Sequence, residues 1–178
     1  LPGQTTGDLE HTLARTIALG PDRIALFGYA HVPHLIPRQK RIDASALPGQ
    51  AERFAMAWLG YSMLTSAGYR SIGFDHFARP EDPLAIAADE ARLHRNFQGF
   101  TDDDAPVLIG LGASAISSFP ELIVQNEKNT GRYRMLLSQG RHPKTLGVIR
   151  SRSDRATGRL IEALLCHGAA RLETKSGR

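Results

Sequence analysis

Apolar residues recur along this chain in two patterns, one typical of helices and one typical of buried strands. A helix is predicted to begin at Asp8, because apolar residues follow it at a spacing of four, and to end at Gly20-Pro21. Residues 23–29 are short and apolar, which is typical of a strand buried on both faces. Residues 50–67 form the next helix and gather apolar side chains on one face, namely Phe54, Ala57, Trp58, Tyr61, Leu64 and Thr65.

The same alternation continues through the rest of the chain. The pattern predicts strands at 69–74 and 107–109, and helices at 83–92, 126–139 and 154–167, with a frayed polar tail from Arg171. Helices that alternate with strands indicate a parallel sheet with crossover helices, and therefore the α/β class. In such folds ligands bind where the strands end. Polar or glycine-rich clusters follow each predicted strand at 29–31, 75–76 and 110–112.

Composition limits the possible classes of protein. The 178 residues are 42% hydrophobic, which is enough for a sizeable core, and no run approaches the roughly 18 apolar residues of a membrane helix. Cys166 is the single cysteine, so an intrachain disulfide and any metal site with more than one thiolate from this chain are excluded. A lone thiol indicates a reducing compartment, and we expect a cytoplasmic protein. The modest net charge of +4 fits nucleic acid, an acidic small molecule or no charged partner at all.

Three clusters carry candidate chemistry. His31 and His34, taken with Asp75, His76 and His94, contain metal-binding residue types, but no spacing among them matches a ligand motif, and we predict no metal site. Gly110-x-Gly112 follows a predicted strand and fits either a bound phosphate or adenosine, or close packing of the backbone.

The third cluster, residues 92–100, is the densest. Its Arg95 and His94 suit carboxylates, Phe97 can stack on a flat ring, and Gln98 can donate a hydrogen bond. A solvated basic turn and a single-stranded nucleic-acid site are the alternatives.

Several motifs, taken in order, resemble one family. They are Phe27-Gly28-Tyr29-Ala30-His31-Val32-Pro33, Ile72-Gly73-Phe74-Asp75-His76-Phe77-Ala78-Arg79-Pro80, Leu93-His94-Arg95-Asn96-Phe97-Gln98-Gly99, Gly110-Leu111-Gly112-Ala113-Ser114-Ala115-Ile116-Ser117 and Gln125-Asn126. Together they resemble the oxygen-independent coproporphyrinogen III oxidases, which are radical S-adenosylmethionine enzymes of haem biosynthesis. The resemblance runs from Leu1 to about His167.

The resemblance implies a fold and a division into domains. It implies that residues 1–150 form the C-terminal half of an incomplete parallel (β/α) barrel, and that residues 151–178 begin a helical C-terminal domain. It also implies the activity, which is oxidative decarboxylation of coproporphyrinogen III to protoporphyrinogen IX. A [4Fe–4S] cluster and one or two S-adenosylmethionine molecules are the implied cofactors.

The resemblance assigns site residues one by one. It places Phe27 and Ala30 beside the cluster-bound S-adenosylmethionine, and Phe97, Gln98 and Ile116 beside a second molecule of this cofactor. By their chemistry, His76, His94 and Arg95 are expected to bind substrate carboxylates. No catalytic residue is assigned.

The chain departs from the family in one respect. The family's Cys-x3-Cys-x2-Cys motif, which ligates the cluster, is absent. We therefore expect a fragment that is inactive alone and self-associates, from a longer protein that is a monomer without nucleic-acid or membrane partners. A haem-trafficking relative without decarboxylase activity is the alternative function.

Overall fold

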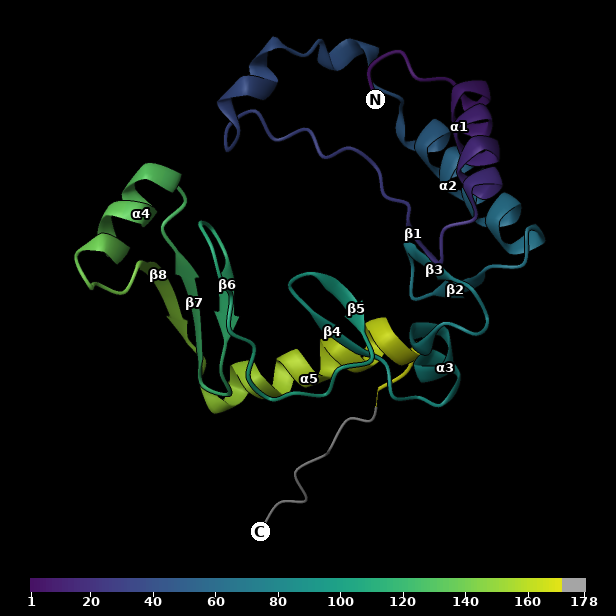
Figure 1. The fold of residues 1–178 in the computed structure, drawn as a ribbon. Helices are drawn as coiled ribbons and strands as arrows, with labels where there is room; N and C mark the ends of the chain where they lie inside the picture. Colours follow the sequence, from purple (N-terminus) through teal and green to yellow (C-terminus); the bar gives the residue numbers. More distant parts are fainter. Residues whose placement is uncertain (171–178) are drawn as a thin grey trace. The chain divides into compact units, whose positions relative to one another are not determined.

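A computed structural model describes residues 1–170, and the predicted frayed tail lies outside them (Figure 1). The chain divides into two compact units, the first spanning Leu1–Arg92 and the second beginning at Leu93. The predicted domain boundary at residue 150 stays a prediction.

The first unit opens with helix α1 (Thr6–Leu19), whose ends follow from local chemistry. Thr5 is the N-cap residue, and it exchanges hydrogen bonds with Asp8 in a capping box: the Asp8 amide donates to Thr5 Oγ1 at 3.2 Å, and the Thr5 amide donates to Asp8 Oδ2 at 2.8 Å. Asp8 is therefore the third residue of the helix and not its cap. Gly20 ends the helix in the left-handed conformation, as the sequence predicts.

A small sheet follows, in the order β1–β3–β2, made of β1 (Arg23–Ala25), β2 (Arg70–Ile72) and β3 (His76–Ala78). Both pairings are antiparallel, so β1 and β2 run parallel to each other with β3 between them. The expected direct parallel pairing is wrong for these strands. A turn at 73–75, which begins at Gly73 with φ of 61°, returns the chain so that β3 takes the central place.

Helix α2 (Gln50–Ser66) connects β1 to β2, after two short 3₁₀ turns, η1 (Pro37–Arg41) and η2 (Ala44–Ala46). Helix α3 (Pro83–Asp89) ends the unit. The predicted strand 23–29 keeps only the three residues of β1, none of which is buried, so double-sided burial is wrong here. Arg23 and Ala25 of β1 are exposed because no layer of the first unit (Leu1–Arg92) covers the face of the strand on which they lie.

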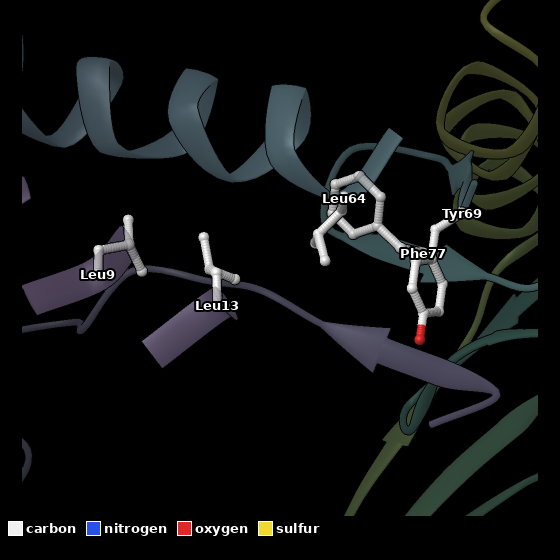
Figure 2. Packing of buried hydrophobic residues seen from close by; sticks show 5 residues of the cluster. All are labelled: Leu9, Leu13, Leu64, Tyr69 and Phe77. Carbon is white, nitrogen blue, oxygen red and sulfur yellow. The ribbon is translucent and has the colours of Figure 1, made fainter. Parts of the chain in front are cut away.

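The core of the first unit lies between α1, α2 and the sheet, where Leu9, Leu13, Leu64, Tyr69 and Phe77 are buried together (Figure 2). The predicted apolar face of α2 is mostly wrong. Its Phe54 and Trp58 are 74% and 62% exposed, whereas Leu64 is buried as predicted and is joined on the inward side by Gly60. A Cβ atom at Gly60 would lie 2.2 Å from Leu26 Cδ2, so the small residue faces the tightest contact.

The second unit is built from hairpins. Strands β4 (His94–Asn96) and β5 (Gly99–Thr101) pair antiparallel, and β6 (Ile116–Ser118), β7 (Leu122–Asn126) and β8 (Lys144–Ile149) form an antiparallel sheet in that order. None of these strands was predicted.

The helices of the second unit are α4 (Thr130–Ser138) and α5 (Arg152–His167). Both fall within the predicted helical segments or extend them by two residues. The predicted helix at 126–139 begins only at Thr130, because Asn126 still belongs to β7. The predicted strand 107–109 contributes a single bridge, from Leu108 to Ser118.

Candidate functional site

The residue run singled out from the sequence folds as the β4–β5 hairpin, with Phe97 and Gln98 at its tip. The Asn96 side chain shapes the turn, because its Oδ1 accepts a hydrogen bond from the Gln98 amide at 2.7 Å. Gly99 follows with φ of 135°, a backbone conformation that favours glycine. Phe97 is 51% exposed, so its ring is available to a ligand. Within residues 1–170, no hydrogen bond ties down the Gln98 side-chain amide.

Helix α5 fixes the base of the hairpin through one carboxylate. Glu162 Oε1 accepts a hydrogen bond from the Arg95 amide at 3.2 Å and lies 3.3 Å from His94 Nδ1. The Arg95 guanidinium lies 4.7 Å from the centre of the Phe100 ring, which is a cation–π contact. The hairpin therefore presents its tip from a fixed base, which suits a binding site.

A cavity of about 670 Å³ opens beside the hairpin inside the second unit, a size typical of small-molecule sites. All of β4, Phe97 and several residues of α5 line it. Its charged lining is mixed, comprising Arg95, Arg150, Arg155, Arg159, Asp103, Asp104 and Glu162. Arg155 is already paired with Glu121, with Nη1 2.5 Å from Oε1. Arg150 is engaged as well, because its Nη2 donates to the carbonyl oxygens of Phe119 and Pro120. The lining is therefore rich in guanidinium groups, several of them already held by other groups and balanced by carboxylates.

The glycine-rich segment 110–115 leads into Ile116, a predicted cofactor contact. The amide of Gly110 donates to Ser117 Oγ at 3.1 Å, and that of Gly112 donates to the Tyr133 hydroxyl at 3.1 Å. Both glycine amides are thus occupied by side chains. A Cβ atom at Gly110 would lie 2.5 Å from the Ile116 carbonyl oxygen. Of the two readings of the glycines, close backbone packing is the one this geometry supports, and a phosphate cradle is not.

The first unit carries the other predicted cofactor contacts, after β1. Phe27 is exposed and lines a largely apolar cavity of about 780 Å³, together with Tyr29, His31 and Arg53. Gln39, which the sequence did not single out, shapes this segment. Its Oε1 accepts from the Val32 amide at 2.5 Å and its Nε2 donates to the Ala30 carbonyl at 3.0 Å.

His76 and Asp75 lie at the turn into β3, with His76 Nδ1 2.6 Å from Asp75 Oδ1. Both side chains are largely buried. The pairing orients the imidazole, and the expected carboxylate binding by His76 stays a prediction.

The predicted site residues are divided between the two units. Phe27, Ala30 and His76 belong to the first unit, and the second unit holds His94, Arg95, Phe97, Gln98 and Ile116. Of the second set, His94, Arg95 and Phe97 line the cavity, whereas Gln98 and Ile116 do not. In residues 1–170, no group of three or more His, Cys, Asp or Glu side chains is gathered as metal ligands. Burial, reinforced by the charge of Glu162, raises the pKa of the Cys166 thiol, which therefore stays protonated near neutral pH.

Comparison with known proteins gives consistent relatives. An oxygen-independent coproporphyrinogen III oxidase from Cereibacter sphaeroides is 46% identical over 166 residues, which cover 93% of this chain and 37% of that protein. One from Paracoccus denitrificans is 44% identical over 173 residues, covering 97% of this chain and 38% of that protein. The chain therefore spans well under half the length of these relatives. No family model matches it.

A solved structure agrees with these relatives. Coproporphyrinogen III oxidase from Escherichia coli, described as a radical SAM enzyme, matches with a TM-score of 0.83 and 38% identity, over 93% of this chain and 38% of that one. The match confirms the predicted α/β class and the resemblance seen in the motifs. Among the described residues, no helix is both long and apolar enough to cross a membrane.

Proposed function

On the premise that this chain is a homologue of the oxygen-independent coproporphyrinogen III oxidases, we propose that the whole protein converts coproporphyrinogen III to protoporphyrinogen IX. The observation that carries the proposal is the β4–β5 hairpin, whose exposed Phe97 and Gln98 stand on a base fixed by Glu162. The cytoplasm, a monomeric whole protein, self-association of this chain alone, and the absence of nucleic-acid and membrane partners are parts of the same proposal. The relatives lend no support to the haem-trafficking alternative.

The chain's residues do not fit an iron–sulfur cluster held by three thiolates. Cys166 is its single cysteine, and burial raises the pKa of that thiol, which disfavours the thiolate that would bind iron. We therefore assign this chain no part in cluster ligation.

The residues do fit S-adenosylmethionine, one molecule or two. The half-exposed Phe97 ring can stack on the adenine, the Gln98 amide can donate to a ring nitrogen, and Ile116 adds an apolar wall from the same unit. In the first unit, Phe27 lines an apolar cavity, and Ala30, which is not part of that lining, follows three residues later as the other candidate contact. S-adenosylmethionine, when bound, supplies the hydrogen-abstracting chemistry, and these side chains bind and orient it.

The cationic groups of the site suit the substrate. Coproporphyrinogen III carries four carboxylates, and a guanidinium can hold a carboxylate through two parallel hydrogen bonds. We propose Arg95, His94 and His76 as carboxylate-binding residues, with Arg159 of α5 as a further candidate on the cavity wall. Their role is to hold the propionates in place while the chemistry proceeds.

The test compares Phe97→Ala with Leu146→Ala in the whole protein. Leu146 is an exposed apolar residue on β8 of the same unit and is absent from the cavity lining, so it serves as the control. Stacking on an aromatic ring contributes about 1–3 kcal/mol per base, so Phe97→Ala should weaken S-adenosylmethionine binding about tenfold or more by calorimetry. Equal affinities in the two variants, or no release of carbon dioxide from coproporphyrinogen III by the unaltered protein, would overturn the proposal.

A further inference from the structure

Asn126, the last residue of β7, carries a side chain that none of the proposed binding roles uses. It is 5% exposed, and its amide nitrogen donates both hydrogens to the glycine-rich segment. Asn126 Nδ2 lies 3.2 Å from the Gly110 carbonyl oxygen and 2.9 Å from that of Gly112. A buried side chain whose two N–H groups both donate to loop carbonyl oxygens holds that loop in one conformation.

Other groups hold the same segment from the opposite side. The hydroxyls of Ser117 and Tyr133 accept the amides of Gly110 and Gly112, so each glycine is bound through both its N–H and its carbonyl. The backbone N–H of Asn126 also donates to the Ala115 carbonyl at 2.9 Å. The clamp therefore fixes the backbone from Gly110 to the residue before Ile116.

The position of Ile116 depends on this clamp. The Gly110 backbone lies against Ile116 so closely that a Cβ atom would meet the Ile116 carbonyl oxygen at 2.5 Å. Ile116 is also paired with Gln125, the neighbour of Asn126, in the β6–β7 register. Moving the glycine segment thus requires moving Ile116.

We propose that Asn126 is a positioning residue that sets the S-adenosylmethionine contact at Ile116 by clamping residues 110–115. The inference rests on the proposed function, because it takes the Ile116 contact from there. Aspartate has the shape of asparagine but, when ionised, accepts hydrogen bonds and donates none. Only the amide can bind two carbonyl oxygens at once.

The test is Asn126→Asp in the whole protein, with Asn129→Asp as the matched control. Asn129 uses only its oxygen, which accepts the Arg132 amide at 3.0 Å at the start of α4, and aspartate keeps that acceptor. In Asn126→Asp a carboxylate would face two carbonyl oxygens. We expect amide exchange at Gly110 and Gly112 to accelerate at least tenfold, and S-adenosylmethionine affinity to fall about tenfold at about pH 8.

The pH profile separates positioning from general damage. Burial and the facing carbonyl oxygens disfavour the charged carboxyl, so lowering the pH to about 6 should protonate it and restore one donated hydrogen bond. Affinity should then recover in Asn126→Asp alone. Tyr133→Phe, which removes one hydroxyl acceptor, should loosen the segment less and show no such recovery.

Each remaining outcome is decisive. Unchanged exchange at Gly110 and Gly112 in Asn126→Asp would overturn the clamp, whether or not Tyr133→Phe accelerates exchange at Gly112. Faster exchange with unchanged S-adenosylmethionine affinity would overturn the positioning role. Failure of the unaltered protein to bind S-adenosylmethionine would overturn the proposed function, and the positioning role with it, while the exchange data would still report on the clamp.

Discussion

The same substitution, glycine to alanine, should act in opposite directions at two positions of the second unit. Gly110 lies against the Ile116 backbone, and an added Cβ would be 2.5 Å from a carbonyl oxygen. Gly158 lies inside α5, and an added Cβ would meet nothing within 4 Å. Neither residue has a positive φ, so space and helix propensity decide both outcomes.

The magnitudes follow from these surroundings. Gly110→Ala forces the backbones apart, which costs about 1–3 kcal/mol as overpacking. It also strains the hydrogen bonds to Ser117 and Asn126, at about 1 kcal/mol each. The expected loss in free energy of unfolding is therefore about 3–5 kcal/mol. Gly158→Ala should raise it by about 1 kcal/mol, because alanine loses less backbone entropy in a helix.

Urea unfolding followed by circular dichroism measures both effects, with amide exchange at β6 and β7 to locate the change in the second unit. The free energy of unfolding of the unaltered protein should lie between those of the two variants. A Gly110→Ala variant as stable as Gly158→Ala would refute the argument, because it would mean that the close approach to Ile116 is absent in solution.

Three further outcomes are expected. Leu64→Ala removes a fully buried side chain from the first unit and should cost about 3 kcal/mol of unfolding free energy in urea, whereas Leu19→Ala, at an exposed position, should change it little. Burial raises the pKa of Asp82, but hydrogen bonds from Arg23 and a backbone amide of α3 outweigh it and leave the pKa below its ordinary value. The ionised form of Asp82 therefore stabilises the fold above its unfolded-state pKa of about 4, and this stabilisation is lost as the pH falls through the lower folded-state pKa. Asp82→Asn should remove this dependence of the urea midpoint on pH. A hydrogen bond from Ser151, the N-cap residue of α5, lowers the pKa of Asp154. Asp154→Asn should therefore weaken the dependence of α5 helicity on pH in the acid range, measured by circular dichroism. An acid profile that does not change would contradict this.

The helices were predictable because their signals are local. Thr5 with Asp8, and Ser151 with Asp154, close capping boxes within four residues of chain, and glycine ends both helices in the left-handed conformation. Such contacts need nothing from the rest of the fold. The β4–β5 hairpin also carried a local signal that the sequence reading missed, since Asn96 shapes the turn and Gly99 closes it.

The buried face of α2 was not predictable from its own residues. Phe54 and Trp58 are more apolar than Gly60, yet Gly60 is the residue that is buried. Leu26 packs so closely against this position that only a residue without a side chain fits there. The site shows the same limit. Motifs point to Phe97, Gln98 and Ile116 as candidate contacts, but Glu162, which fixes the hairpin, comes from a helix more than sixty residues away along the chain.

The sequence by itself determined where the helices lie, with their ends displaced by up to four residues, and which family the motifs resemble, because caps, turns and motif residues act within a few positions of one another. The tertiary structure alone decided strand order, the burial of α2 and the contacts of the Asn126 side chain. Its partners Gly110 and Gly112 lie 16 and 14 residues away, and only the pairing of β6 with β7 brings them within hydrogen-bond distance. Contacts between residues that are distant in the sequence depend on tertiary packing, and no single segment of the sequence determines that packing.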